Sequence, residues 1–255
     1  IFVTFTCDEN GRSVSGTDIT AALVVLQGMG IDAFGLNCSA GPEQMLLQLK
    51  RLREYARVPL IAKPNAGMPI IENGETVYRC TGEEFTALVP EFLAAGVAVF
   101  GGCCGTTPEF IKLLNGTFAG CTPGRPAHRM PSVLCTPVDT VTVDGITVVG
   151  ERINPTGKKR FQQALRENDM NYVLEQAVSQ VEAGAQVLDV NVGAPGVDEP
   201  ALMPKVVKAL QSVTSLPLQL DSSNVQALEN GLRVYNDKPI VNSTNGEQEK
   251  LDAIL

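Results

Sequence analysis

Two regions of the sequence place three cysteines where their thiols could meet. Cys103 and Cys104 follow an apolar run, residues 96–100, and precede a helix start marked by threonine and proline. Neighbouring side chains of a strand point to opposite faces, so adjacent thiols converge only where the strand ends and a glycine-flanked turn begins. Cys38 likewise closes the apolar run 31–36 and precedes a predicted helix. Three thiols at strand ends predict a zinc site with one coordination position open.

Such a site has a defined chemistry. Three thiolates leave Zn²⁺ with little Lewis acidity, but the metal still lowers the pKa of an incoming thiol and so provides a thiolate nucleophile. The 65 residues that separate Cys38 from Cys103 exclude a zinc-finger knuckle and favour ligands from separate strands of a barrel rim. Two alternatives stay open from spacing alone: buried structural cysteines, or a vicinal disulfide between Cys103 and Cys104. The other cysteines are interpreted as structural: Cys7, Cys80, Cys121 and Cys135.

Polar residues close four predicted strands in the second half of the chain. These residues are Glu151, Asn154, Asp189, Asn191, Asp221 and Asn242. A carboxylate accepts two hydrogen bonds at once, and an amide both donates and accepts, which suits the edge of a pterin ring. Each residue alone could equally cap a helix or form a turn. Four polar strand ends together favour a binding rim.

The elements that position these residues alternate between strand and helix. Strands are predicted at 1–7, 31–38, 58–65, 97–103, 147–152, 186–192, 216–221 and 239–242. Helices are predicted at 18–28, 44–56, 83–95, 108–114, 161–167, 172–183, 199–212 and 225–235, and a further helix begins at 247. A hairpin is predicted at 70–78, around Asn73-Gly74.

Each half therefore offers four β/α units, whereas a closed (β/α)₈ barrel needs eight. We expect an α/β fold of two TIM-barrel modules, each represented by about half a barrel. The predicted boundaries are 1–115, a linker at 116–142, and 143–255. The linker is rich in proline and glycine, with a short strand at 138–143, and its His128 is predicted to be a surface residue.

Composition narrows the functional classes. The chain has 255 residues, 44% of them hydrophobic, which suffices for a core, and no apolar stretch of membrane-spanning length. Its net charge of −8 argues against a nucleic-acid surface. Seven cysteines at non-disulfide spacings favour a reducing compartment, so we expect a cytoplasmic protein. The sequence opens within a strand-like run and without methionine, which we interpret as a piece of a longer chain.

The cysteine motifs resemble a known family. Gly-Leu-Asn-Cys-Ser at 35–39 and Gly-Gly-Cys-Cys-Gly-Thr-Thr-Pro at 101–108 are similar to the homocysteine S-methyltransferase family. The resemblance implies that Cys38, Cys103 and Cys104 bind Zn²⁺ as catalytic thiolates that activate homocysteine. It also implies that residues 1–115 are the C-terminal half of that family's barrel. Asn65 could supply zinc with an oxygen ligand when no thiol is bound.

The second half resembles the pterin-binding methyltransferase family. The motifs are Gly-Glu-Arg-Ile-Asn-Pro-Thr-Gly at 150–157, Leu-Asp-Val-Asn-Val-Gly at 188–193, Leu-Asp-Ser-Ser at 220–223 and Asn-Ser-Thr-Asn-Gly-Glu at 242–247. By this resemblance Asp221 and Asn242 contact the pterin ring. Asp189 and Asn191 lie beside them, and Glu151 and Asn154 line the rim. Residues 143–255 correspond to the N-terminal half of a barrel.

The order of the two modules is that of cobalamin-dependent enzymes that methylate homocysteine from 5-methyltetrahydrofolate. It implies a methyltransferase that gives methionine and tetrahydrofolate. Cobalamin, as methylcobalamin, would be carried by a domain in cis or in trans outside these motifs. Two alternatives remain: a related corrinoid and folate methyltransferase acting on another thiol, and an inactive fragment that binds zinc or pterin.

Overall fold

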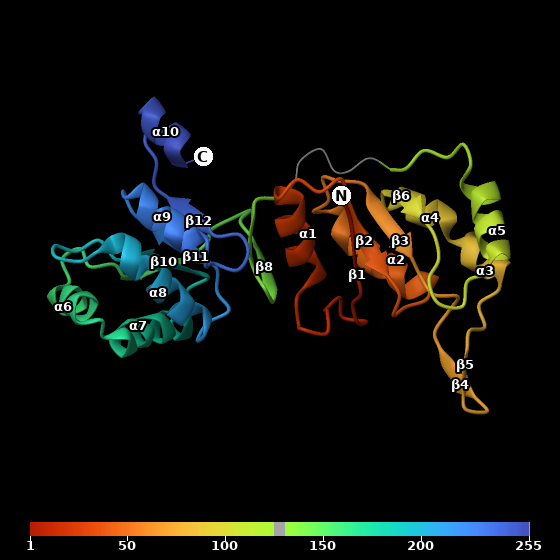
Figure 1. Cartoon of the computed structure of the whole chain (residues 1–255), viewed down its shortest axis with the longest axis horizontal. Helices are drawn as coiled ribbons and strands as arrows, with labels where there is room; N and C mark the ends of the chain where they lie inside the picture. Colours follow the sequence, from red (N-terminus) through yellow and green to blue (C-terminus); the bar gives the residue numbers. More distant parts are fainter. Residues whose placement is uncertain (125–130, 255) are drawn as a thin grey trace. The chain divides into compact units, whose positions relative to one another are not determined.

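The computed structural model describes residues 1–124 and 131–254, which form two compact units, Ile1–Pro131 and Ser132–Leu255. His128 lies outside the described residues. Each unit has a four-stranded, all-parallel sheet, drawn with its helices in Figure 1. Among the described residues, no helix combines the length and apolarity needed to cross a bilayer.

The first unit places its strands in the order β1-β2-β3-β6. Its elements are β1 (Phe2–Phe5), α1 (Ile19–Gly28), β2 (Ala33–Asn37), α2 (Pro42–Arg53), β3 (Leu60–Lys63), β4 (Ile70–Glu72), β5 (Glu75–Val77), α3 (Gly82–Ala87), α4 (Val89–Ala94), β6 (Val97–Phe100) and α5 (Pro108–Phe118). The hairpin predicted around Asn73-Gly74 is confirmed as the antiparallel pair β4–β5, which extends away from the parallel sheet (Figure 1).

The second unit places its strands in the order β12-β11-β10-β9. Its elements are β7 (Val133–Thr136), β8 (Asp139–Thr142), β9 (Val149–Ile153), α6 (Lys159–Glu167), α7 (Met170–Glu182), β10 (Val187–Asn191), α8 (Glu199–Gln211), β11 (Leu218–Asp221), α9 (Val225–Leu232), β12 (Ile240–Asn242) and α10 (Gln248–Ile254). Four parallel strands in sequence order, joined through helices, are the arrangement of half a (β/α)₈ barrel, so the α/β prediction is confirmed.

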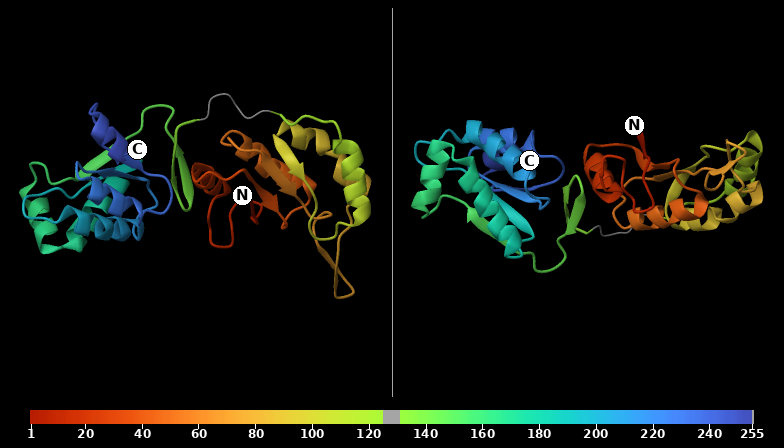
Figure 2. Two further views of the ribbon diagram at one scale, coloured as in Figure 1. Left: turned by 45° about the horizontal axis from the view of Figure 1, so that its top comes forward. Right: turned by 90° about the horizontal axis from the view of Figure 1, so that it is seen from below.

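Each core lies between one face of the sheet and its helices, as the two views of Figure 2 show. In the first unit Phe34, Leu36, Leu60 and Ala62 belong to this core. In the second unit the corresponding strand residues are Leu188, Val190, Leu218 and Leu220. Strand side chains alternate in direction, so the residues between them face the other side of the sheet.

Gly35 marks a close approach between β2 and β3 on that other side. A Cβ atom at this position would lie 1.9 Å from the carbonyl oxygen of Ile61, well inside van der Waals contact. Gly35 pairs with Ile61 in the parallel register. Glycine therefore permits the close spacing of β2, which ends before Cys38, and β3, which lies between β2 and β6.

The single helix predicted at 83–95 is wrong, because the structure has two helices, α3 and α4, that meet at Leu88. Pro90 lies in the first turn of α4. Proline has no amide hydrogen and its ring clashes with the preceding helical turn, so the helix ends and restarts there. The break leaves Phe85 and Phe92 buried in two different hydrophobic clusters.

The β7–β8 hairpin belongs to the second unit. Cys135 forms a bridge with Lys238, and the Tyr235 hydroxyl donates to the Cys135 carbonyl oxygen at 3.0 Å. The predicted linker, residues 116–142, thus spans the end of α5, residues outside those described, and this hairpin. The division into two half-barrel modules and a linker stays a prediction.

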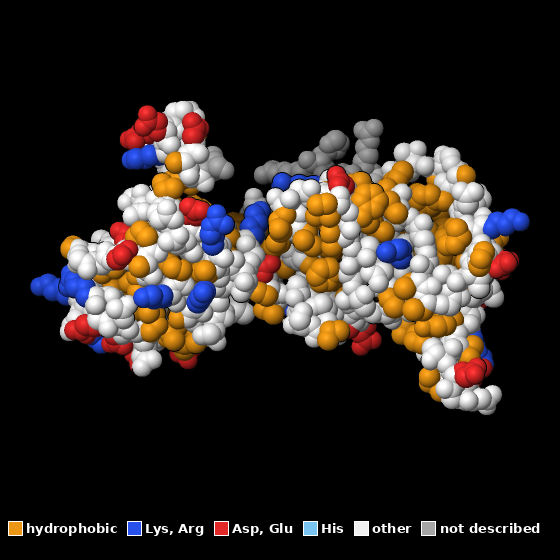
Figure 3. All heavy atoms as spheres, in the orientation of Figure 1, with side chains coloured by type: hydrophobic (Ala, Val, Ile, Leu, Met, Phe, Trp, Pro, Cys, Tyr) orange, Lys and Arg blue, Asp and Glu red, His pale blue; other side chains and the backbone are white. Residues whose placement is uncertain are grey.

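On the face drawn in Figure 3, Lys and Arg side chains lie among acidic and apolar ones on both units.

Candidate functional site

The first unit brings the three predicted thiols together. The sulfur of Cys38 lies 3.6 Å from that of Cys104, and the sulfurs of Cys103 and Cys104 are 3.9 Å apart. All three sulfur atoms lie within 4.8 Å of one another. A disulfide bond is only about 2.05 Å long, so the vicinal pair is not bonded in this structure. Cys38 and Cys103 are half-buried and Cys104 is exposed.

Turns at two strand ends aim these thiols. Cys38 and the next residue, Ser39, have left-handed backbone angles, with φ of 61° and 59°. This conformation is uncommon for residues other than glycine, and it turns the chain sharply at the end of β2. Cys103 and Cys104 follow β6 after two glycines, so the strand predicted to reach Cys103 is shorter than expected.

The end of β3 and the chain that follows it hold both turns. The amide of Cys38 donates to the carbonyl oxygen of Lys63 at 3.0 Å, and that of Cys103 donates to Pro64 at 2.9 Å. Asn65 is only 2% exposed, and its Oδ1 accepts the amide hydrogen of Cys104 at 3.2 Å. In this structure the predicted oxygen donor thus orients a cysteine. The role of Asn65 as a zinc ligand stays a prediction.

The thiols differ in acidity. Burial raises the pKa of Cys38, but hydrogen bonds from the Ser39 backbone and from the other two cysteines outweigh it and leave the pKa lowered. Burial, followed by its hydrogen bond with Cys38, raises the pKa of Cys103 to about 11. The cluster therefore favours a thiolate at Cys38 over one at Cys103, and a cation would be needed to hold both as thiolates.

The separations suit a tetrahedral metal. Zn–S bonds of about 2.3 Å at tetrahedral angles place two sulfurs about 3.8 Å apart. The two measured contacts, 3.6 and 3.9 Å, bracket that value. Three soft thiolates are also a donor set that favours zinc over magnesium or calcium. The residues present therefore fit a zinc ion with three protein ligands.

Sequence reasoning missed Tyr78, which follows the β4–β5 hairpin. Desolvation raises the pKa of its phenol, and so do a hydrogen bond with Cys104 and the negative charge of the three cysteines. Its ring lies against Gly105, where a Cβ atom would come within 2.5 Å of the Tyr78 Cγ. The available signal was the hairpin itself, because it returns the chain to the rim.

The second unit gathers the predicted polar residues on the sheet face opposite its helices. In the parallel register Asp189 pairs with Gln219, Asn191 with Asp221, and Asp221 with Asn242. Asn191 donates to Asp221 Oδ2 at 2.8 Å. The carboxyl ends of three neighbouring strands thus form a continuous row of carboxylates and amides.

Glu151, within β9, and Asn154, directly after it, complete this rim. Asn154 is 8% exposed, and its Oδ1 accepts the amide hydrogen of Thr156 at 3.0 Å, which is a turn role. Glu151 is exposed and pairs with Lys158, whose Nζ lies 3.2 Å from its Oε2. Both residues also affect the pKa of Asp189: a hydrogen bond from Asn154 lowers it and the charge of Glu151 raises it. All six predicted residues therefore lie in one region.

Asp189 is the buried centre of the rim, with 3% of its surface exposed. Desolvation raises its pKa, and the charges of Asp221 and Glu151 add to that effect. Hydrogen bonds from Gln219, at 2.6 Å, and from Asn154 oppose it.

Sequence reasoning missed Gln219, although its place two residues before Asp221 in the strand signals the same sheet face. Glu199 was also missed, and its Oε2 accepts the Ser222 hydroxyl at 2.7 Å.

The raised pKa of Asp189 predicts a pH dependence of stability. The folded state binds this proton more tightly than the unfolded chain, so the free energy of unfolding should fall as pH rises from about 3.8 through the folded-state pKa. In Asp189→Asn this contribution should be absent. Urea titrations of both proteins between pH 3.5 and 8 would check this. A parallel fall in the two proteins would contradict it.

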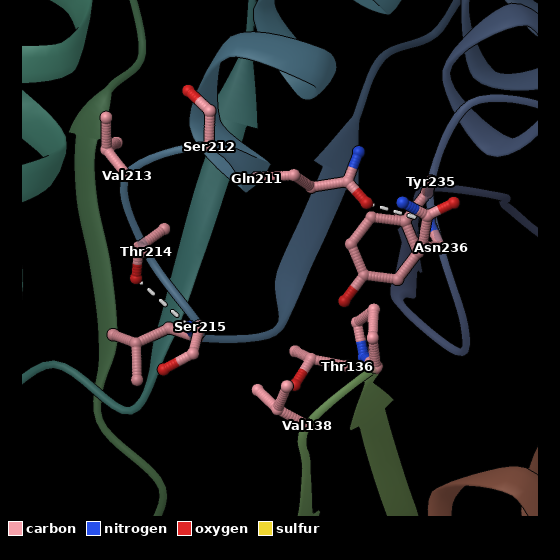
Figure 4. A pocket seen from close by; sticks show the side chains of 11 residues that line it. Thr136, Val138, Gln211, Ser212, Val213, Thr214, Ser215, Tyr235 and Asn236 are labelled. Carbon is pink, nitrogen blue, oxygen red and sulfur yellow. Dashed lines mark hydrogen bonds between the residues drawn. The ribbon is translucent and has the colours of Figure 1, made fainter. Parts of the chain in front are cut away.

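One cavity lies away from both clusters. It has a volume of about 320 Å³ and is lined by the β7–β8 turn, the loop that precedes β11, and Tyr235 (Figure 4). The Oε1 of Gln211 accepts the amide hydrogen of Asn236 at 2.8 Å, and Thr214 Oγ1 accepts that of Leu216 at 3.0 Å. The cavity is at the amino end of β11, whereas the predicted rim is at its carboxyl end.

Two known families match the segments that contain the cysteine cluster and the polar rim. Residues 1–118 match the homocysteine S-methyltransferase family, and residues 150–254 match the pterin binding enzyme family. Both resemblances predicted from the motifs are confirmed. The chain thus joins a segment that matches homocysteine S-methyltransferases to one that matches pterin binding enzymes.

Two individual relatives match nearly the whole chain. Over 97% of its length it is 33% identical to the methionine synthase of Mycobacterium leprae, and it is 34% identical to that of Mycobacterium tuberculosis. The chain spans about a fifth, 21%, of each of these relatives.

Solved structures align with just under half of this chain each. The homocysteine methyltransferase MmuM of Escherichia coli is 27% identical and aligns with 46% of this chain and 38% of its own, at a TM-score of 0.36. The dihydropteroate synthase of Xanthomonas albilineans is 19% identical and aligns with 49% of this chain and 46% of its own, also at 0.36.

Proposed function

We propose that this chain is the region of a cobalamin-dependent methionine synthase in which the homocysteine module is followed by the methyltetrahydrofolate module. The observation that carries the proposal is the thiol cluster, whose three sulfurs lie within 4.8 Å in the segment that matches homocysteine S-methyltransferases. The pterin-binding match that follows it supports the same order of modules.

In the first module, Cys38, Cys103 and Cys104 would hold Zn²⁺. The ion would supply one function, lowering the pKa of the homocysteine thiol so that a thiolate is available at neutral pH. The protein's part is orientation, because the chain after β3 fixes the backbone of each cysteine through Lys63, Pro64 and Asn65.

In the second module, Asp221 and Asn242 would contact the pterin ring of 5-methyltetrahydrofolate, beside Asp189 and Asn191. Glu151 and Asn154 would line the rim. Release of the methyl group requires that N5 of the pterin be protonated or hydrogen-bonded, since an unprotonated N5 would have to leave as a nitrogen anion, which is a poor leaving group. Burial raises the pKa of Asp189, so its carboxyl holds a proton more tightly than that of an exposed aspartate.

The methyl group would pass from the folate to homocysteine by way of cobalamin, giving methionine and tetrahydrofolate. The cobalamin domain would act in cis or in trans. A related methyltransferase with another thiol substrate is one alternative, which the following test separates. A fragment that binds zinc or pterin without turnover is the other.

We expect about one zinc per chain in the reduced protein, and almost none in Cys103→Ser/Cys104→Ser, because hydroxyls are poor zinc ligands beside a single thiolate. Metal analysis after dialysis measures this. Cys7→Ser/Cys121→Ser is the matched control, since it also removes two thiols but none from the cluster, and it should keep its zinc.

Binding of homocysteine to the zinc-loaded protein, compared with cysteine and 2-mercaptoethanol, then tests the substrate. A folded, reduced wild-type chain that takes up no zinc would refute the proposed zinc site. Preference for another thiol would favour the alternative methyltransferase.

A further inference from the structure

Strand β9 carries one residue more than its partner β10 beside Asp189. On either side of Asp189 the two strands pair in parallel, through Leu188–Gly150 and Val190–Ile153. Two residues of β9, Glu151 and Arg152, therefore lie opposite the single residue Asp189. Two residues against one is the arrangement of a β-bulge, a device that re-aims side chains near binding sites.

This bulge decides which residues at the end of β9 reach the polar rim. Side chains alternate along a strand, so one extra residue reverses the faces of all residues that follow it. With the bulge, Ile153 lies on the core face beside Val190, fully buried, and Asn154 follows on the rim face. In a regular strand, Ile153 would turn to the rim and Asn154 to the core. The place of Asn154 at the rim therefore depends on the bulge.

Gln180 satisfies the backbone at this point. Its Oε1 accepts the amide hydrogen of Arg152 at 2.7 Å. Its Nε2 donates to the carbonyl oxygen of Gln176, one helical turn earlier in α7, at 3.0 Å. Gln180 is only 7% exposed, and both polar ends of its side chain are thus committed. The two contacts fix which way the side-chain amide faces.

Gly150, directly before the bulge, leaves room for this contact. A Cβ atom at Gly150 would lie 2.7 Å from Oε1 of Gln180 and 3.0 Å from its Cδ. Because Gly150 pairs with the core residue Leu188, this Cβ would point to the core face, so Gln180 lies on the side of the sheet opposite the rim. A methyl group here would displace the end of the glutamine side chain from the Arg152 amide.

We propose that Gln180 is a positioning residue for the pterin site, which holds the β9 bulge from the core face and thereby keeps Asn154 at the rim. The inference rests on the proposed folate function and extends it to a residue that would not touch the ligand. Gln180 would act through the Arg152 backbone, since that amide is the group it binds in the bulged strand.

Removal of the acceptor should weaken folate binding. Gln180→Met keeps the length of the side chain but leaves the Arg152 amide without its partner. The affinity for 5-methyltetrahydrofolate should fall by about tenfold, the scale of one hydrogen bond lost at a buried polar group. Gly150→Ala should lower the affinity as well, because it displaces the same oxygen while Gln180 is still present.

The conservative variant Gln180→Glu should rescue binding in a pH-dependent way. A protonated carboxyl group offers an acceptor for Arg152 and a donor for Gln176, as the native amide does, whereas the ionised form offers acceptors only. Its affinity relative to the wild type at the same pH should therefore rise as pH falls from 8 to 5.5. The relative affinity of Gln180→Met should not change over this range.

The experiment uses the full chain and two measurements. Calorimetry with 5-methyltetrahydrofolate gives the affinities, and hydrogen exchange of the ligand-free chain, labelled with ¹⁵N-arginine, reports the Arg152 amide. Gln180→Met should speed this exchange by about tenfold, the factor expected for one lost hydrogen bond. Val173→Ala is the control, because it removes buried volume from the same helix two turns earlier. It should lower stability but keep both the affinity and the slow exchange.

Faster exchange of Arg152 with unchanged affinity in Gln180→Met would overturn the inference, since the bulge would then not govern the pterin site. Unchanged exchange would overturn it too, because Gln180 would not be holding the amide. An equal loss of affinity in Val173→Ala would indicate a general effect of stability and would contradict a specific role. If the wild type binds no folate, the pterin function fails and the inference fails with it, whatever the exchange of Arg152 shows.

Discussion

Asp221→Asn is expected to lower the affinity of the chain for 5-methyltetrahydrofolate by about 10- to 100-fold. Hydrogen bonds to a charged group contribute about 1.5–3 kcal/mol, and each 1.4 kcal/mol is a factor of ten. Asp221 ends β11 and pairs in register with Asn191 and Asn242, so its carboxylate lies in the middle of the rim. An amide would present a donor where the pterin edge also presents donors.

Isothermal titration calorimetry with the folate measures this loss. Asp144→Asn provides the control, because Asp144 is an exposed aspartate of the same unit, in the segment between β8 and β9. It makes the same change in net charge and should bind as the wild type does. If the two variants lose affinity equally, the effect is one of overall charge and the assignment of Asp221 is wrong.

Gly35→Ala is expected to destabilise the first unit by about 3 kcal/mol or more. The new methyl group would overlap the Ile61 carbonyl oxygen, 1.9 Å from the ideal Cβ position, and backbone cannot swing aside as a side chain can. Relief requires that β2 and β3 separate, which also moves Cys38 away from its hydrogen bond to Lys63. Zinc affinity should therefore fall together with stability.

Urea denaturation of the chain measures the stability change. Gly28→Ala is the matched control, since Gly28 is the last residue of α1 and a Cβ there meets nothing within 4 Å. Alanine should stabilise it slightly, by up to about 1 kcal/mol, through its higher helix propensity. A neutral effect of Gly35→Ala would show that the two strands move apart at little cost.

Much of the fold followed from local patterns. Asp18 caps α1 by accepting from the amides of Thr20 and Ala21, and Thr81 and Glu84 form a reciprocal capping box at α3. These short-range interactions are visible in sequence. The residues at which strands end were less predictable, because the length of a strand depends on how far the neighbouring strand continues to pair with it. Strand β7 was missed, since part of its support comes from a distant residue, Tyr235, whose hydroxyl donates to the Cys135 carbonyl oxygen.

The candidate site likewise has features that the sequence predicted and features that it did not. The convergence of Cys38, Cys103 and Cys104 could be predicted, because strand ends of one parallel sheet share an edge. The contact between Tyr78 and the cluster could not, since it depends on the length and path of a hairpin that leaves the sheet. Gln219 was also missed, although it lies inside a predicted strand two residues before Asp221 and therefore on the same face of the sheet.

The row Asp189, Asn191, Gln219 and Asp221 has a consequence for how such a protein can evolve. These residues alternate with core residues Leu188, Val190, Leu218 and Leu220 along two adjacent strands. Substitutions in the row change the ligand while the core stays intact, so binding specificity can drift by point mutation. Insertion or deletion of a single residue in β10 or β11 exchanges the two faces and loses core and rim together. Lineages of this protein should therefore vary in the identity of the rim residues and in the length of the loops, while the lengths of these two strands remain constant.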